Sequence, residues 1–532
     1  MSLCLNAPTI GYDTLVEVID VLADEGDDEC RDTIVALSQT CRYLRAEGSR
    51  RLLSRPVRVN LIRQPRLVAA FCHFMLGDPT VRSPFLRRLA VDVYDLKEDV
   101  SRRLADVLAL SCCLEDLHID SLFKVTKPVL AIICSAISSL TSLRHFSVKW
   151  CNGDDSSYYQ IFYDALRAIR SPLTTAQVAV PSIKLPSSYI LYMRVRDPIF
   201  LLSKSSSSLR RVEVDGIIKV GGGIRVYPLV EELAISDYLE GMPDLRTYLL
   251  CFPNIQHLRC GSAGIGWFRH RHDADILQES CCDATVQQWH DYNKRGSARQ
   301  DHAWKMLRSF RGSIIDAYVL ALPCRGLRLH LMSTGGRRSA EYAMLSTILS
   351  DIRPSSLRFS LKVHDGRGYI PILPPHSLTG WATNLRTLEI RINIVKQFFD
   401  LDECFSHVVD MLRAMSVTSF QLEIRCANMD TQYGEILETP SESEDGVKCR
   451  DPLDYTDGIC YAQNTLLQED LHQRVRDILS ITPTLRQVTV MWARCYAEVP
   501  VRIVGIDKDN FPHSFDRPGG ESDGWRREVV DW

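Results

Sequence analysis

The sequence of 532 residues lacks the motifs of the common catalytic and metal-binding sites. It holds 18 cysteines but no Cys-x-x-Cys, and it has no Gly-x-Ser-x-Gly, no His-Glu-x-x-His and no kinase-like motif set. Zinc knuckles, dithiol redox sites, serine hydrolases and zinc proteases of the common types therefore have no support. We expect no catalytic residue, no metal and no cofactor, and a protein that is not an enzyme.

The chain also lacks an excess of charge of one sign and a long hydrophobic run. Basic residues number 63 and acidic residues 66, so there is no electrostatic footprint for nucleic acid. The longest apolar stretch, Val129–Leu140, falls short of the ~20 residues that span a bilayer. The first ten residues do not resemble a signal peptide, and the scattered cysteines fit reduced thiols. We therefore expect an intracellular protein, cytoplasmic or nuclear, without a membrane or nucleic-acid partner.

One alternative stays open for a metal. The segment His270-Arg-His272-Asp273, with Cys281-Cys282 downstream, contains side chains that zinc prefers. Histidines at i and i+2 point apart on a helix but share a face on a strand. A solvated loop edge is the favoured interpretation, and bound zinc or loss of folding on chelation would contradict it.

A short phrase recurs along the chain, in which an apolar residue, two polar residues and an apolar residue precede an alternating pair. The copies begin at Leu86, Leu114, Leu143, Leu209, Val230, Ile255, Leu385 and Leu485, with a degenerate copy at Leu357. In Leu114-Glu-Asp-Leu117-His-Ile119, alternation places Leu117 and Ile119 on one face, as in a half-buried strand. The phrase therefore predicts a short strand at each copy.

Segments with helical periodicity separate the copies, as in Leu104, Val107 and Leu108. One strand and one helix per 20–29 residues is typical of leucine-rich repeats, although the usual asparagine positions are mostly absent. The fold class predicted is an α/β solenoid, an irregular leucine-rich-repeat array of short parallel strands alternating with helices. We expect it over residues 61–500, with insertions near 155–200, 262–320 and 428–462, and an irregular cap or tail over 501–532.

In such an array the strand residues that point away from the core line an accessible surface. Mixed charge with occasional aromatic side chains suits recognition of a protein partner. The candidates for this partner-binding surface are His118, Asp120, Lys149, Trp150, Glu213, Asp215, Arg259, Glu389, Arg391, Met491 and Trp492.

Residues 1–60 differ from the array and predict a small all-α module. Leu15, Val18, Ile19 and Leu22 form an apolar helical stripe, and a second stripe follows an acidic break. A unit of this size is too small for a large core of its own, so it is expected to pack against a partner. A helical cap that seals the first repeat is the alternative interpretation.

The module resembles the F-box family in Leu15-Val-Glu-Val-Ile-Asp-Val-Leu22 and in Leu37-Ser-Gln-Thr-Cys41-Arg-Tyr-Leu44-Arg45. Ile10-Gly-Tyr-Asp13 stands where that family has Leu-Pro. Outside the module, Gln64–Leu76 and Trp304 through Gly312–Tyr318 are similar to the expanded F-box-like proteins of mushroom-forming fungi, which carry irregular leucine-rich units.

The resemblance implies a substrate-recognition subunit of a Skp–cullin–F-box ubiquitin ligase. It implies a Skp-type adaptor and a cullin complex as partners, besides an unknown protein substrate held on the repeat surface. Adaptor contacts would come from Leu15, Ile19, Leu37, Cys41 and Leu44. A leucine-rich-repeat interaction scaffold without a ligase is the alternative function.

Overall fold

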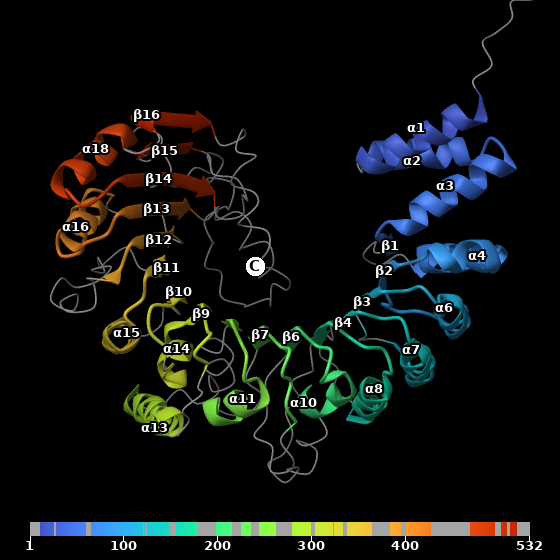
Figure 1. Cartoon of the computed structure of the whole chain (residues 1–532), viewed down its shortest axis with the longest axis horizontal. Helices are drawn as coiled ribbons and strands as arrows, with labels where there is room; N and C mark the ends of the chain where they lie inside the picture. The colour runs from blue at the N-terminus through green and yellow to red at the C-terminus, as the bar shows by residue number, and fades with distance from the viewer. Residues whose placement is uncertain are drawn as a thin grey trace, which may run out of the picture. The chain divides into compact units, whose positions relative to one another are not determined.

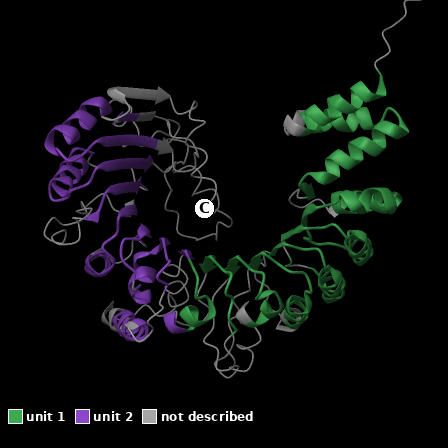
Figure 2. Cartoon of the chain, viewed as in Figure 1, with its two compact units in different colours: residues 1–241, 247–255 green, residues 242–246, 256–532 purple. Residues whose placement is uncertain are grey.

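The computed structural model describes most of the chain, and it divides that chain into two compact units. The described residues are 11–25, 28–59, 65–120, 122, 125–148, 156–178, 198–214, 225–235, 244–261, 279–298, 304–322, 324–333, 338–363, 384–394, 401–426, 469–494, 502–507 and 511–518. Unit 1 comprises residues 1–241 and 247–255, and unit 2 comprises residues 242–246 and 256–532 (Figure 2).

Unit 1 begins with a module of three helices, α1 (Tyr12–Glu25), α2 (Asp28–Ser38) and α3 (Arg42–Ser54). A small core holds them together, formed by Ile19, Ala23, Ile34 and Leu44. Helix α3 crosses α2 closely at Gly48, where an added Cβ would lie 1.9 Å from the Ser38 hydroxyl oxygen. Residue 48 therefore has to be glycine for this crossing.

The rest of unit 1 alternates strands and helices. The strands are β1 (Val57–Val59), β2 (Arg88–Asp92), β3 (Asp116–Asp120), β4 (His145–Val148), β5 (Thr175–Val178), β6 (Arg211–Val214) and β7 (Glu232–Ile235), each paired in parallel with the next. The helical segments are α4 (Pro65–Gly77), α5 (Pro79–Arg82), η1 (Ser83–Phe85), α6 (Glu98–Leu110), α7 (Lys127–Ser139), α8 (Ser156–Ala168), α10 (Pro198–Leu201), η2 (Ser203–Ser205) and α11 (Leu245–Cys251). Figure 1 shows the strands side by side with the helices along one side of the sheet.

Unit 2 repeats this arrangement with longer strands. They are β8 (His257–Cys260), β9 (Ser309–Ser313), β10 (Arg328–Met332), β11 (Ser356–Val363), β12 (Thr387–Ile394), β13 (Ser419–Cys426), β14 (Gln487–Arg494), β15 (Arg502–Asp507) and β16 (Phe511–Pro518). The helices are α13 (Glu279–Ala298), α14 (Ile314–Leu320), α15 (Arg338–Ile352), α16 (Leu401–Arg413) and α18 (Leu471–Ile481). Strands β8 to β14 are parallel, whereas β15 and β16 are antiparallel to their neighbours.

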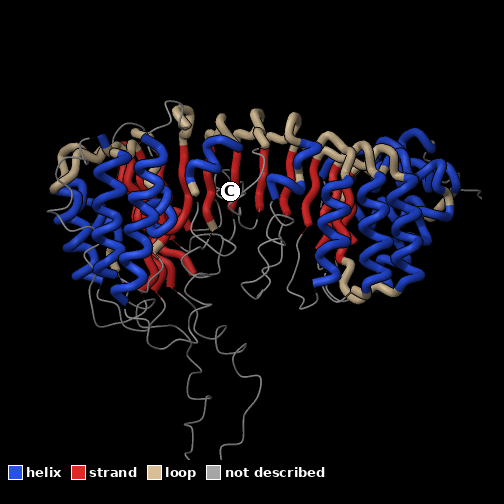
Figure 3. The backbone as a smooth tube through the Cα atoms, turned by 90° about the horizontal axis from the view of Figure 1, so that it is seen from below, coloured by secondary structure: helices blue, strands red, loops and turns tan. Residues whose placement is uncertain are grey.

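Every copy of the recurring phrase forms a strand, as predicted. The alternation of apolar and polar residues along it determines which side chains are buried. Leu117 pairs with Leu89 on one side and Phe146 on the other, and Ile119 pairs with Val91 and Val148. All of them are at most 2% exposed, so apolar rows run across the strands beneath the helices. The helices (blue) and strands (red) form two layers within each unit (Figure 3).

The predicted insertions at 155–200 and 262–320 each contain a strand of the sheet, which corrects their boundaries. Strand β5 lies between β4 and β6, and β9 lies between β8 and β10. The recurring phrase does not predict these two strands, because Ala176 of β5 and Gly312 of β9 stand where the other copies have a larger apolar residue. At Gly312 a Cβ would meet the Phe310 ring at 2.8 Å, so the ring occupies that space.

The segment 501–532, predicted to be irregular, contains the antiparallel strands β15 and β16 in its described part. The insertion predicted at 428–462 lies outside the described residues. None of the described helices is long and apolar enough to cross a membrane.

Short polar side chains, mostly hydroxyls but also the amide of Asn254, tie successive turns together. The Ser142 hydroxyl donates to the carbonyl of Leu114 at 2.7 Å, and Ser208 donates to Leu173 at 2.8 Å. Ser355 in unit 2 makes the same bond to Gly326 at 2.9 Å. Each residue lies just before a strand, so the bond joins the start of one repeat to the start of the one before it.

Ser171 is the most buried of these links, at 2% exposed, and its removal is expected to destabilise unit 1. Its hydroxyl donates to the Leu140 carbonyl at 2.7 Å and accepts from the Leu143 amide at 3.2 Å. Ser171→Ala leaves both groups unsatisfied, which is expected to cost about 1–3 kcal/mol in urea unfolding. Ser138→Ala, at an exposed helical serine, is the control, and equal costs for both variants would contradict the assignment.

Candidate functional site

Within each unit, the strand residues that point away from the helices form a mostly polar surface, here called the strand face. On unit 1 the strand face is acidic. Its charged side chains are Asp92, Asp116, Asp120, Glu213 and Glu232 against Arg58, Arg88 and Arg211. His118 lies between carboxylates, with its Nε2 atom 3.0 Å from Asp120 Oδ1.

The predicted residues His118, Asp120 and Glu213 lie on this strand face and are half-buried. The strands β3 and β6 carry them, with β4 and β5 between. Lys149, Trp150 and Asp215 lie outside the described residues.

On unit 2 the strand face is basic. The charged side chains described on β8 to β13 are Arg259, Arg311, Arg328, Arg358, Arg391 and Arg425 against Glu389 and Glu423. The predicted residues Arg259, Glu389 and Arg391 belong to this set, and all three are half-buried. The two units thus present opposite charge on equivalent faces, although the whole chain carries only −3.

One row of the basic face crosses β8 to β12. Register pairs Arg259 with Arg311, Arg311 with His330, His330 with Arg358 and Arg358 with Glu389. Burial lowers the pKa of the Arg311 guanidinium, and the positive charges of Arg259 and Arg358 lower it further. Like charges on adjacent strands are unfavourable, so sheet stability alone does not account for this row.

His330 stands in the middle of the row and is neutral at physiological pH. Burial lowers its pKa to about 3, and the charges of Arg358, Arg311 and Arg391 act in the same direction. The Ser360 hydroxyl lies 3.5 Å from its Nε2 atom. Nothing local in the sequence marks His330, because only strand register places it between Arg311 and Arg358.

The next row holds the most buried ion pair described on this face. Glu423, 7% exposed, receives Arg391 Nε at 2.7 Å and Arg425 Nε at 2.5 Å. Both arginines are about one-fifth exposed, at 21% and 18%. Arg391 therefore forms an ion pair with Glu423, which fixes the positions of these two side chains.

Met491 and Trp492 were predicted to be accessible, and their burial corrects that prediction. Their exposed fractions are 7% and 2%. Strand β14 continues to Arg494, so Trp492 lies within the strand. It pairs with Ile424 of β13 and lies in the apolar row of the core.

The predicted adaptor-binding residues hold the module together. Ile19 and Leu44 are in its core, 0% and 1% exposed, and Leu15, Leu37 and Cys41 pack against that core. The Cys41 sulfur also accepts from the Leu44 amide at 3.5 Å, at the start of α3.

Other apolar side chains of the module face solvent instead. They are Tyr12, Val18, Val21, Val35 and Tyr43, between 38% and 59% exposed. Tyr12 from α1 and Tyr43 from α3 meet edge to face, with ring centroids 6.1 Å apart. We call these five residues the module surface.

The described residues offer little for covalent or metal chemistry. No cluster of three metal-ligating side chains occurs among them, and residues 270–273 lie outside them. Burial raises the pKa of Cys72 and Cys324 to about 11 and that of Cys134 to about 12, which makes these thiols weak nucleophiles. The polar strand faces are instead suited to non-covalent recognition.

A scan against protein-family models finds no match, and a search of curated proteins finds none either.

The depressed pKa of His330 predicts a loss of stability in acid. The neutral imidazole is favoured in the folded state, so its contribution is complete above pH 6.5 and is lost as pH falls toward about 3. His330→Gln lacks this contribution. Urea unfolding at pH 7 and at lower pH should show wild type losing more stability than the variant. Parallel losses would contradict the neutral state of His330.

Glu423→Gln is expected to destabilise unit 2 strongly, because two partly buried guanidiniums lose their counter-charge. Breaking a buried pair of this kind costs about 3 kcal/mol. Glu389→Gln is the matched control, since Glu389 lies 3.3 Å from Arg358 with both side chains near one-third exposed. An exposed pair contributes about 1 kcal/mol or less. Equal unfolding free energies for the two variants would contradict the ordering role of Glu423.

Proposed function

We propose that the chain is a non-catalytic receptor, the substrate-recognition subunit of a Skp–cullin–F-box ubiquitin ligase. The module of α1 to α3 docks on a Skp-type adaptor, and the array that follows, an irregular form of the leucine-rich repeat, holds a target protein. Ubiquitin transfer is carried out by the partner subunits. The chain contributes proximity, since it positions a target near an activated ubiquitin.

The module surface carries the docking half of this proposal. A three-helix unit with a core of four buried residues keeps five apolar side chains exposed, and two of them, Tyr12 and Tyr43, are in contact with each other. Aromatic side chains such as Tyr12 and Tyr43 are enriched in protein interfaces. The resemblance to the F-box family supplies the identity of the partner.

The strand faces support the receptor half. They are broad, polar and supported by rigid strands, and they carry charge in excess of what sheet formation requires. An enzyme site would need convergent reactive groups in a deep pocket. Among the described residues, the strand faces instead provide a wide surface of paired and unpaired charges.

The module surface predicts which substitutions abolish adaptor binding. Val21→Lys with Tyr43→Ala should weaken binding of the full chain to a purified Skp-type adaptor by about 100-fold, equivalent to ~3 kcal/mol. Both side chains are more than half exposed, so the unfolding midpoint should stay unchanged. Calorimetric titration measures the affinity, and circular dichroism checks the fold.

Leu110→Lys is the matched control, at a 46% exposed apolar residue of α6 outside the module, and it should bind the adaptor as wild type does. No binding of the wild-type chain at micromolar concentration would contradict the ligase role. That result would favour an interaction scaffold without a ligase.

A further inference from the structure

A shallow depression of ≈ 580 Å³ lies in unit 2 where β10, β11 and β12 begin. The side chains that matter here are Arg325, Arg328, Arg353 and Arg386, with Asn384 and Thr387. We call the four arginines the arginine edge. They come from the turns that precede three successive strands, and Arg328 also belongs to the basic strand face.

The arginine edge concentrates positive charge without counter-charge. Among the described residues, no carboxylate lines the depression, and none of the four guanidiniums forms an ion pair. The nearby acid Asp351 is paired with Lys294 at 2.9 Å. Arginine is charged at every physiological pH, so four exposed guanidiniums around one depression give this edge a permanent positive charge.

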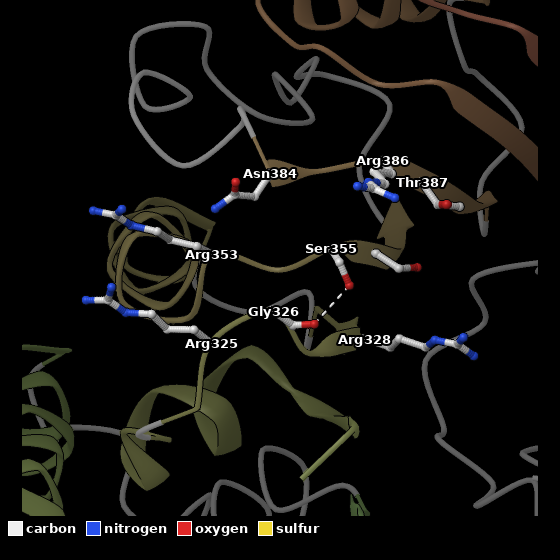
Figure 4. Close-up of a pocket in the computed structure, with 9 residues that line it drawn as sticks. Arg325, Gly326, Arg328, Arg353, Ser355, Asn384, Arg386 and Thr387 are labelled. Carbon is white, nitrogen blue, oxygen red and sulfur yellow. Dashed lines mark hydrogen bonds between the residues drawn. The ribbon is translucent and has the colours of Figure 1, made fainter. Parts of the chain in front are cut away.

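The shape of the site indicates an elongated ligand. In Figure 4 Arg325, Arg353 and Asn384 point to one side, and Arg328 and Thr387 point to the other. Ser355 lies between these groups, where its hydroxyl bonds to the Gly326 carbonyl at 2.9 Å and joins two turns. Guanidiniums that diverge in this way do not converge on a single small anion. They suit a chain that crosses the edge with negative groups on both sides.

Arg353 occupies a backbone position where arginine is unfavourable. It follows the last residue of α15 with a φ of 46°, and its amide bonds to the Leu349 carbonyl at 2.9 Å. Glycine is the usual residue at this left-handed position after a helix. The adjacent turn has glycine in that conformation, Gly326 with a φ of 75°. An arginine held with backbone strain beside Arg325 points to a role in binding.

We infer that the arginine edge binds an extended, acidic segment of a partner protein. Arginine pairs with carboxylates through two parallel hydrogen bonds, and Asn384 and Thr387 add neutral groups that bond to a peptide backbone. A nucleic acid fits less well, because no aromatic side chain lines the depression to stack with bases.

This inference rests on the receptor role proposed above and names the class of target. The test uses the full chain without adaptor. Failure to bind the peptide would therefore say nothing against adaptor docking, and failure to bind the adaptor would say nothing against this site. Fluorescence anisotropy measures binding of a labelled peptide of alternating glutamate and serine. A peptide with glutamine in place of glutamate is its neutral counterpart, and a phosphoserine peptide, inorganic phosphate and a single-stranded oligonucleotide are the other probes.

Wild type should bind the glutamate peptide about tenfold or more tightly than the glutamine peptide, with affinity falling as salt rises. Arg325→Gln with Arg353→Gly should remove this preference while raising the melting temperature, because glycine relieves the strain at residue 353. A stabilised variant that has lost binding cannot be explained by misfolding.

Two control substitutions distinguish binding at this site from a general effect of positive charge and from a general effect of backbone strain. Ala321→Gly relieves another left-handed residue, with a φ of 45°, and should stabilise the chain without changing binding. Arg328→Gln should weaken binding, whereas Arg88→Gln, at the equivalent exposed place in β2 of unit 1, should not.

The inference is overturned if the two peptides bind alike or if Arg88→Gln and Arg328→Gln act alike. Tighter binding of the oligonucleotide would make the occupant a nucleic acid, and full competition by inorganic phosphate would make it a small anion. A phosphoserine peptide that binds better than the glutamate peptide supports the site and identifies phosphorylation as the source of its charge.

Discussion

The structure depends on one constraint: each strand buries its apolar side only when a neighbouring strand extends the same row. Leu117 pairs with Leu89 on one side and Phe146 on the other and so belongs to such a row. The side chains of one repeat alone do not form a core. Strand pairing therefore sets the position of every repeat, and the helices cover the row from one side. The helices do not cover the opposite side, where most of the polar and charged side chains are half-buried, so its chemistry can vary more than that of the apolar row.

That freedom explains the contrast between the two strand faces. The described strand face carries more carboxylates than guanidiniums in unit 1 and more guanidiniums than carboxylates in unit 2, while the apolar rows beneath them hardly differ in character. Burying the charges of the Glu423 ion pair and straining the backbone at Arg353 both cost free energy, and neither helps the sheet of unit 2 to form. Such costs are expected at surfaces that bind, since charge placed for a partner is poorly placed for the free protein.

The sequence predicts the alternation of strand and helix well, because a period of two and a period near four are both local signals. It predicts β3 from Leu117 and Ile119 but misses β5 and β9, where Ala176 and Gly312 interrupt the phrase. The reason for Gly312 is the Phe310 ring, a contact that no periodicity encodes. Burial of Trp492 likewise depends on how far β14 extends, which its local pattern does not determine.

The candidate sites were harder to predict. An apolar stripe on a short helix marks residues such as Ile19 that face inward, but another member of the same stripe, Val18, is 40% exposed and belongs to the module surface. The arginine edge comes from turns far apart in sequence, and only strand register brings Arg325 beside Arg353. Pairs of arginines are common in the sequence, and nothing local distinguishes these two.

The hydroxyl links between turns bear on how such a chain can change in length. Among the described residues, they fasten the start of one strand to the start of the preceding one, as Ser355 does to Gly326. Residues can therefore be gained or lost after a strand while the pairing register is kept. The connection from Cys426 of β13 to Leu471 of α18 is far longer than that from Asp120 of β3 to Lys127 of α7, yet β13 and β14 pair in parallel just as β3 and β4 do. Insertions after the strands can therefore change the connecting segments while the strands and their pairing stay the same.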